Sequence, residues 1–242
     1  MKSVLLDVSG VLRDNLQAIF ESYRRVLGPA GWTLDVTPMQ AYRLRGFARY
    51  NLLENFLEAL FALSQEQVPL KTALKWPQRV GLCVQKHPLL DKTEWADKVK
   101  KDFRRMDSPY LQSVPVLPGS REALFRLAAK FKIAAVSNSG SSFNKAWLKA
   151  HGLDRFFSIF VGEQEVRRKK PHPDGILLAC RHLYVLPEQT YFVGDSESDI
   201  MAAREARSRP LGVLTGTATR EQLEGAGAEN VFQNLLELSK TI

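Results

Sequence analysis

Residues 132–138 of the chain, KIAAVSN, form an apolar run of strand length that ends in two polar residues. Two other segments have the same form, residues 3–7 (SVLLD) and residues 190–195 (TYFVGD). Strands of a parallel sheet that is covered on both faces read as continuous apolar runs. Because ligands bind at the carboxyl ends of such strands, these three segments predict one site that is assembled from distant parts of the chain.

Predicted strands and helices alternate over the carboxyl-terminal half of the chain. The strands that we expect are residues 3–7, 132–136, 156–161, 190–193 and 211–214. The helices that we expect are residues 121–130, with Ser120 as N-cap, 143–151, 174–183, 200–206 and one near 220–224. This alternation predicts an α/β fold with a doubly wound parallel sheet.

The stretch between the first two predicted strands has a different character. Residues 15–114 contain apolar positions at helical spacing, for example within residues 52–61, and no strand pattern of comparable strength. We therefore predict an α/β core made of residues 1–14 and 115–242. An inserted helical cap domain, residues 15–114, interrupts that core.

Composition limits the classes of protein that the chain can belong to. Its 242 residues are 45% hydrophobic and 25% charged, as in soluble globular proteins. No apolar run is long enough for a signal peptide or a membrane span, so we expect a cytoplasmic protein with no membrane partner. Cys83 and Cys180 lack metal-ligand spacing and are expected to be buried thiols. The net charge of +8 favours anionic partners, but the basic residues are scattered, so we do not expect nucleic acid.

Three carboxylates are expected at the same edge of the predicted sheet: Asp7, Asp195 and Asp199. Bringing like charges together raises their pKa values and is unfavourable. A hard divalent cation removes that conflict, and Mg²⁺ prefers a few carboxylates together with water and phosphate oxygens. Lys170 can supply a second positive charge. The sequence therefore predicts a Mg²⁺ site with a lysine beside it.

Ser137 and Asn138 offer a hydroxyl, an amide and backbone N–H groups at the start of a predicted helix. The N-terminus of a helix is a natural phosphate site. A metal, an anion cradle, a lysine and a carboxylate that can act as nucleophile suit phosphoryl transfer. We expect the partner to be a small anionic phosphorylated substrate.

The order of these motifs resembles that of the haloacid dehalogenase superfamily of hydrolases. The segments VPVLPGSREALFRLAAKFKIAAVSNSG, RKKPHPDGILLAC and YFVGDSESDIMAAREA resemble the second, third and fourth motif regions of that superfamily. The carboxyl-terminal segment resembles the tail of the phosphoglycolate-phosphatase-like branch. The resemblance implies a Rossmann-like core with a helical cap after the first motif.

The resemblance also implies roles for individual residues. Asp7 would be the nucleophile that forms an aspartyl-phosphate. The main-chain carbonyl of Ser9 and the carboxylate of Asp195 would share Mg²⁺ with Asp7. Asp199 would bind or orient the metal or its waters.

The same resemblance implies the residues that hold the substrate. Ser137 and Asn138 would hold the phosphoryl group, and Lys170 would neutralise charge on the nucleophile and the phosphate. In the cap, Arg45 and Arg49 flank a glycine where caps of this superfamily often reach the substrate. Their guanidinium groups would suit a substrate with a second anionic group.

Ser9 departs from the pattern, because the phosphatases that the chain resembles carry a second aspartate there. That aspartate protonates the leaving oxygen and then activates water. General acid–base catalysis contributes about 10² to 10⁴ in rate, so we expect slow hydrolysis of alkyl phosphates and less loss on acyl or aryl phosphates. On the sequence alone, Ser9→Asp is expected to raise turnover of an alkyl phosphate.

Alternative functions stay open at this point. A phosphonate-cleaving relative also has a small residue at the position of Ser9, but the segment Arg45-Gly46-Phe47-Ala48-Arg49 has arginine where a Schiff-base lysine would be needed. A catalytically weakened phosphate-binding or regulatory protein of the same fold is the second alternative. The sequence does not define the oligomeric state.

Overall fold

The computed structural model describes residues 3–14, 114–216 and 218–242, which belong to one compact unit of the chain. The strands of this part are β1 (Ser3–Leu6), β2 (Lys132–Val136), β3 (Ile159–Val161), β4 (Thr190–Gly194), β5 (Arg209–Val213) and β6 (Asn230–Phe232). The helices are α8 (Ser120–Ala128), α9 (Ser141–Ala150), α10 (Asp174–Leu183), α11 (Glu197–Glu205), α12 (Arg220–Ala226) and α13 (Leu235–Thr241).

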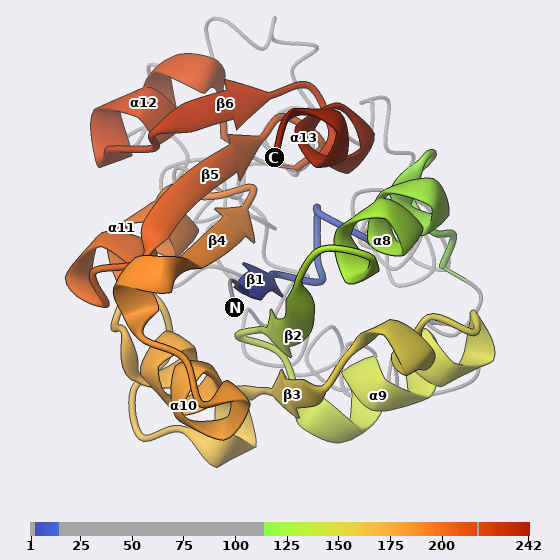
Figure 1. Ribbon diagram of the computed structural model, residues 1–242. Helices are drawn as coiled ribbons and strands as arrows, with labels where there is room; N and C mark the ends of the chain where they lie inside the picture. Colours follow the sequence, from blue (N-terminus) through green and yellow to red (C-terminus); the bar gives the residue numbers. More distant parts are fainter. Residues whose placement is uncertain (1–2, 15–113, 217) are drawn as a thin grey trace, which may run out of the picture. The chain divides into compact units, whose positions relative to one another are not determined.

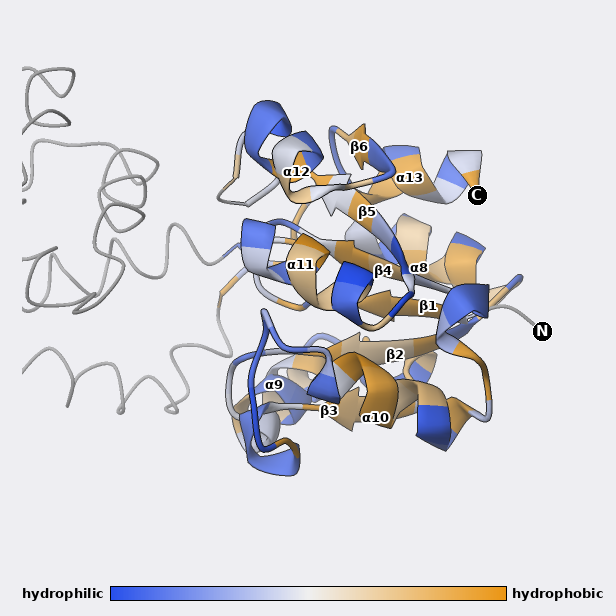
Figure 2. Cartoon of the chain, turned by 90° about the vertical axis from the view of Figure 1, so that its left-hand side faces the viewer, coloured by the Kyte–Doolittle hydropathy of each residue, from blue (hydrophilic) through white to orange (hydrophobic). Residues whose placement is uncertain are grey.

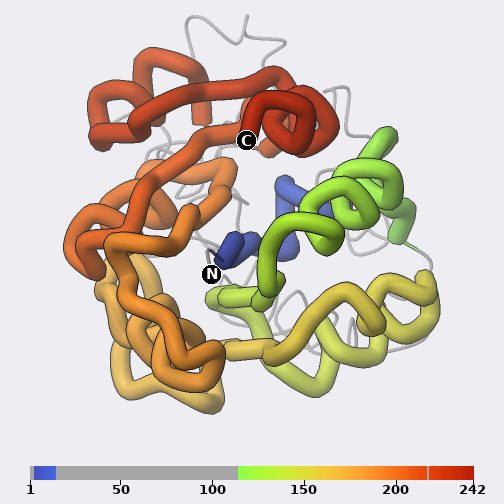
Figure 3. The backbone as a smooth tube through the Cα atoms, viewed as in Figure 1, coloured from blue at the N-terminus to red at the C-terminus, as the bar shows by residue number. Residues whose placement is uncertain are grey.

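The described strands form a six-stranded parallel sheet in the order β3-β2-β1-β4-β5-β6, which confirms the predicted fold class. The first strand lies in the middle, between β2 and β4 (Figures 1 and 3). After β1 the chain adds strands on one side through β3 and then crosses to the other side with β4. This reversal next to β1 is the type of position where ligands bind in doubly wound sheets.

Each face of the sheet buries its own apolar cluster. On one face, residues such as Val4 and Ile133 pack with side chains of α8, α9 and α13. On the other face, Leu5 and Phe192 pack with side chains of α10 and α11. Figure 1 shows the strands between these two helix layers, and Figure 2 colours much of the strands as hydrophobic. Burial on both faces explains why the strands are continuously apolar in sequence.

Several boundaries differ from those predicted. Ser120 is the first residue of α8 and not its N-cap, because Gly119 takes the capping position with a φ of 78°. The predicted strand 156–161 is shortened to β3, because a 3₁₀ turn over Asp154–Phe156 uses its first residue. Strand β6 was not predicted, since a three-residue strand with an exposed first residue gives little periodic signal. Helix α13, seven residues long, was not predicted either.

The predicted helical cap, residues 15–114, lies outside the described residues apart from residue 114, and so does Cys83. Cys180 is a buried free thiol, as expected. Within the described ranges, no helix combines the length and the apolar character that crossing a membrane requires.

Candidate active site

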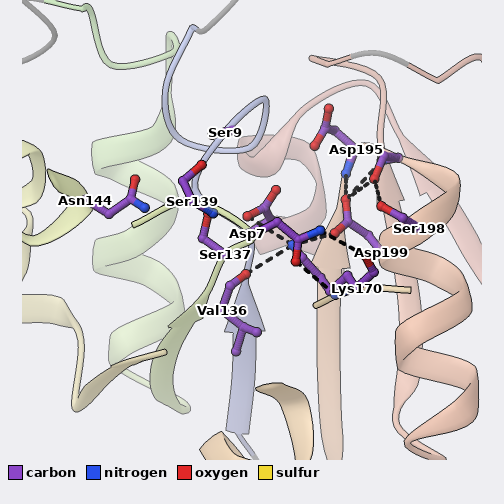
Figure 4. A network of polar contacts seen from close by, with 12 residues as sticks. Asp7, Ser9, Val136, Ser137, Ser139, Asn144, Lys170, Asp195, Ser198 and Asp199 are labelled. Carbon is purple, nitrogen blue, oxygen red and sulfur yellow. Dashed lines mark hydrogen bonds and ion pairs between the residues drawn. The ribbon is translucent and has the colours of Figure 1, made fainter. Parts of the chain in front are cut away.

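The register of the sheet brings three predicted site residues to one edge. Leu6 pairs with Ala135 on one side and with Val193 on the other. Asp7, one residue later, donates its backbone N–H to the carbonyl of Val193 over 2.9 Å. The loops that follow β2 and β4, which carry Ser137 and Asp195, therefore begin beside Asp7. The sequence prediction that these segments form one site is consistent with this geometry (Figure 4).

Lys170 reaches into this edge from the segment before α10. Its Nζ lies 3.1 Å from Oδ1 of Asp7 and 2.6 Å from Oδ1 of Asp199, and it donates to the carbonyl of Val136 over 3.2 Å. The side chain is 4% exposed. Burial alone would lower the pKa of Lys170, but Asp199 and Asp7 outweigh it and raise the pKa above its ordinary value. The lysine is therefore a fixed cation between two carboxylates.

Asp7 is buried beside this lysine, and burial makes its ionised form less favourable. It is 7% exposed, and desolvation raises its pKa above the ordinary value. Lys170 opposes that rise, whereas the nearby charge of Asp199 adds to it. The raised pKa shows that one lysine does not fully compensate the buried charge at this carboxylate.

Asp199 is held by the start of helix α11. Its Oδ2 accepts hydrogen bonds from the backbone N–H of Asp195 (3.2 Å) and Ser196 (3.1 Å), and from the hydroxyl of Ser196 (2.6 Å). Its other oxygen faces Lys170. In this arrangement the carboxylate caps the helix and anchors the lysine, so its contacts support an orienting role within the cluster.

Asp195 is enclosed by backbone. A Cβ built on Gly216 would lie 1.8 Å from Oδ2 of Asp195, and one on Gly10 would lie 2.4 Å from the same atom. The hydroxyl of Thr215 donates to the carbonyl of Gly10 over 2.5 Å, and the N–H of Ala218 donates to the carbonyl of Asp195 over 3.1 Å. The loop after β5 thus fixes the carboxylate against the loop after β1, and only glycine leaves room for it.

The three carboxylates form a cluster that fits a hard cation. Asp7, Asp195 and Asp199 are all buried, and one oxygen from each lies within 4.8 Å of the others. Lys170 contacts two of these carboxylates, Asp7 and Asp199, so a further positive charge among the three would be favourable here. Oxygen donors of this kind match Mg²⁺ better than a softer metal.

Asn138 has a role that the sequence did not predict. Its Nδ2 donates to the carbonyl of Lys170, and its Oδ1 accepts from the backbone N–H of Lys170, both over 2.9 Å. The amide thereby clamps the segment that carries the lysine. Ser137 is buried next to it, and its Oγ accepts the N–H of Ser139 over 3.3 Å, just before α9 begins. The predicted phosphoryl contacts of both residues stay predictions.

Ser9 lies in the loop after β1, above Asp7 in Figure 4. Its hydroxyl accepts a hydrogen bond from Nη2 of Arg13 over 2.9 Å. Burial lowers the pKa of Arg13 to about 10, against the opposing effect of Asp7, so the guanidinium is charged at neutral pH. Arg13 was not predicted from the sequence, although a charged residue directly after the apolar pair Val11 and Leu12 was a possible signal.

Thr215 and Gly216 were not predicted either, because their importance follows from contacts with loops far away in the chain. The predicted substrate residues Arg45 and Arg49 lie outside the described residues.

Comparison with known proteins supports a common origin with hydrolases. The family model described as haloacid dehalogenase-like hydrolase matches residues 4–213. Phosphoglycolate phosphatase from Escherichia coli (strain K12) is 28% identical over 180 residues, which cover 71% of this chain and 71% of that protein.

Solved structures agree on the fold. A predicted phosphoglycolate phosphatase from Haemophilus somnus 129pt matches with a TM-score of 0.71 at 20% identity, covering 99% of this chain and 97% of that one. A hydrolase from Deinococcus radiodurans R1, crystallised with bound phosphate and sodium, matches with a TM-score of 0.69 at 22% identity. That match covers 98% of this chain and 93% of the other.

Proposed function

The chain belongs to the haloacid dehalogenase-like hydrolases, and we propose that this phosphatase-like enzyme hydrolyses a small phosphorylated metabolite through an aspartyl-phosphate on Asp7. The observation that carries the proposal is the buried cluster in which Lys170 contacts both Asp7 and Asp199 while Asp195 lies close by. The phosphoglycolate phosphatase named above supports a small phosphate ester as the substrate class.

In the first step, an oxygen of Asp7 forms a bond to phosphorus while the bond from phosphorus to the leaving oxygen breaks. The leaving oxygen keeps the bonding electron pair. Lys170 neutralises charge that the transferred phosphoryl group brings close to Asp7, and the clamp from Asn138 holds that lysine in place. Ser137 lies at the start of the loop before α9, where the N–H groups of the loop and helix favour an anion.

Asp7, Asp195 and the main-chain carbonyl of Ser9 would hold Mg²⁺, with Asp199 orienting the group. When it is bound, Mg²⁺ supplies positive charge for the phosphoryl oxygens and allows the carboxylates to stay ionised side by side. The protein's own contribution is to keep those oxygens buried and aligned, as the close packing of Gly216 on Asp195 does.

In the second step, water attacks phosphorus, the acyl-phosphate bond of Asp7 breaks, and phosphate and a proton are released. No carboxylate stands at position 9 to accept that proton or to protonate an alkoxide, so hydrolysis of alkyl phosphates should be slow. Acyl and aryl phosphates, whose leaving oxygens are stable as anions, should react faster. The same feature favours a second candidate, a regulatory protein that holds a long-lived aspartyl-phosphate.

The test is a comparison of acetyl phosphate, p-nitrophenyl phosphate and 2-phosphoglycolate with and without Mg²⁺. We expect Mg²⁺-dependent phosphate release that Asp7→Asn lowers by at least about 10³-fold, the scale of losing a nucleophile. Asp154→Asn, an exposed carboxylate, is the control and should keep the wild-type rate. Undiminished activity of Asp7→Asn would exclude the proposed nucleophile, and stoichiometric phosphorylation without release would favour the regulatory candidate.

A further inference from the structure

We propose that Arg13 is a positioning residue that acts through Ser9, and that this pair selects substrates whose leaving oxygen departs without a proton. The inference rests on the proposed phosphatase function and gives a structural cause for its preference for acyl and aryl phosphates over alkyl phosphates. It also changes the expectation for Ser9→Asp that the sequence alone supported.

The loop after β1 places Arg13 opposite Ser9. The N–H of Arg13 donates to the carbonyl of Val8 over 3.0 Å, and the N–H of Gly10 donates to the carbonyl of Arg13 over 2.9 Å. These bonds close the loop on itself, so Nη2 of the arginine meets Oγ of Ser9 at 2.9 Å. Arg13 is 2% exposed, so its charge is shielded from solvent and acts on neighbouring groups inside the protein.

Helix α9 holds the guanidinium from the other side. Cζ of Arg13 lies 4.7 Å from the ring centre of Phe143 and 5.5 Å from that of Trp147. Trp147 is fully buried, and its indole N–H donates to the carbonyl of Val114 over 2.8 Å. Two aromatic faces and one hydroxyl therefore fix the orientation of the arginine. Because α9 begins directly after the loop that carries Ser137, Arg13 packs on a helix that continues from the predicted phosphate site.

This contact determines what the hydroxyl of Ser9 can do. Its oxygen accepts from Arg13, so its single proton is left to be donated in another direction. A hydroxyl polarised by a cation is a strong hydrogen-bond donor to an anionic oxygen, but it keeps its proton. A carboxylate or phenolate can leave from such a site with its electron pair, whereas an alkoxide would need a proton that this hydroxyl does not give up.

The contact between Arg13 and Ser9 predicts that Ser9→Asp alone will not restore general acid–base catalysis. A carboxylate introduced by Ser9→Asp would meet the fork of Arg13 and form a paired contact with it. Its oxygens would then be held by Arg13, which packs against Phe143 and Trp147 of α9, and would not be free to act as an acid or a base. Restoring an acid–base residue should therefore need two changes, Ser9→Asp together with Arg13→Met, which keeps an unbranched side chain against the two rings.

The first experiment compares the wild type, the two single variants and the double variant. The readout is the ratio of kcat/KM for 2-phosphoglycolate to kcat/KM for acetyl phosphate, with Mg²⁺ present. We expect Ser9→Asp alone to change this ratio by less than about threefold and the double variant to raise it by about tenfold or more, within the range of general acid–base catalysis. A tenfold rise from Ser9→Asp alone would overturn the proposal, and that result does not depend on the folding of any Arg13 variant.

The second experiment does not need turnover. Calorimetry measures the affinity for inorganic phosphate in the presence of Mg²⁺. Arg13→Met should weaken phosphate binding about tenfold in a protein that retains Ser9, and by less than about threefold once Ser9→Ala has removed the hydroxyl, because coupled residues are not additive. Equal losses in both backgrounds would overturn the role through Ser9. If no variant, nor the wild type, turns over either substrate, the proposed function fails, and this binding result alone decides the role of Arg13.

Discussion

Lys170→Met is the substitution that tests the electrostatics of the site most severely. It removes the cation that lies 3.1 Å from Asp7 and 2.6 Å from Asp199, and the lysine side chain is 4% exposed. Removing one partner of a buried ion pair leaves the other charge uncompensated and typically costs about 3–5 kcal/mol. For a chain of 242 residues, a change of 1 kcal/mol moves Tm by about 2–4 °C, so a fall of about 6–20 °C is expected without metal.

The assay is thermal unfolding followed by circular dichroism, first in EDTA and then with excess Mg²⁺. Added Mg²⁺ should reduce the difference between Lys170→Met and the wild type, because it supplies positive charge to the same carboxylates. The matched control is Lys169→Met. That lysine pairs with Glu163 at 2.8 Å, but both side chains are more than one-third exposed, so its loss should cost less than about 1 kcal/mol. A Tm for Lys170→Met within about 2 °C of the wild type in EDTA would refute the reasoning.

Two further substitutions test the parts that support the cluster. Gly216→Ala places a methyl group 1.8 Å from Oδ2 of Asp195, and should weaken Mg²⁺ binding measured by calorimetry by at least tenfold, about 1.4 kcal/mol. The control is Gly225→Ala, whose methyl group meets nothing within 4 Å and should leave the affinity unchanged. Equal Mg²⁺ affinities for the two variants would contradict this account. Asn138→Ala removes both hydrogen bonds to the backbone of Lys170, worth about 1–3 kcal/mol together, and should lower kcat and Tm together; an unchanged kcat would show that the clamp does not position the lysine.

The sheet and the grouping of polar residues at one of its edges were predictable because both depend on local patterns. An apolar run followed at once by Asp7, Ser137 or Asp195 specifies a buried parallel strand and a polar residue at its carboxyl end. The observed register then brings those residues together. Helix α10, predicted as residues 174–183, has these bounds in the structure. The buried positions of this helix recur at helical spacing, for example Ile176, Ala179 and Leu183.

The roles of Arg13 and Asn138 were not predictable in the same way. The sequence places Arg13 in an apolar segment but cannot show that Phe143 and Trp147 of a later helix enclose it. Likewise, nothing near Asn138 in the sequence indicates that both ends of its amide bind the backbone of Lys170. Contacts of this kind depend on how the loops are packed, which residue spacing does not encode.

The most direct test of the central claim is a calorimetric titration of Mg²⁺ into the wild type and Asp195→Asn, both freed of metal with EDTA. The cluster of Asp7, Asp195 and Asp199 predicts one Mg²⁺ per chain, with an affinity that Asp195→Asn lowers by at least about tenfold. Glu197→Gln removes a carboxylate two residues further along the chain and should change the affinity by less than about threefold. Equal Mg²⁺ affinity in the wild type and Asp195→Asn would contradict a metal site at this edge of the sheet.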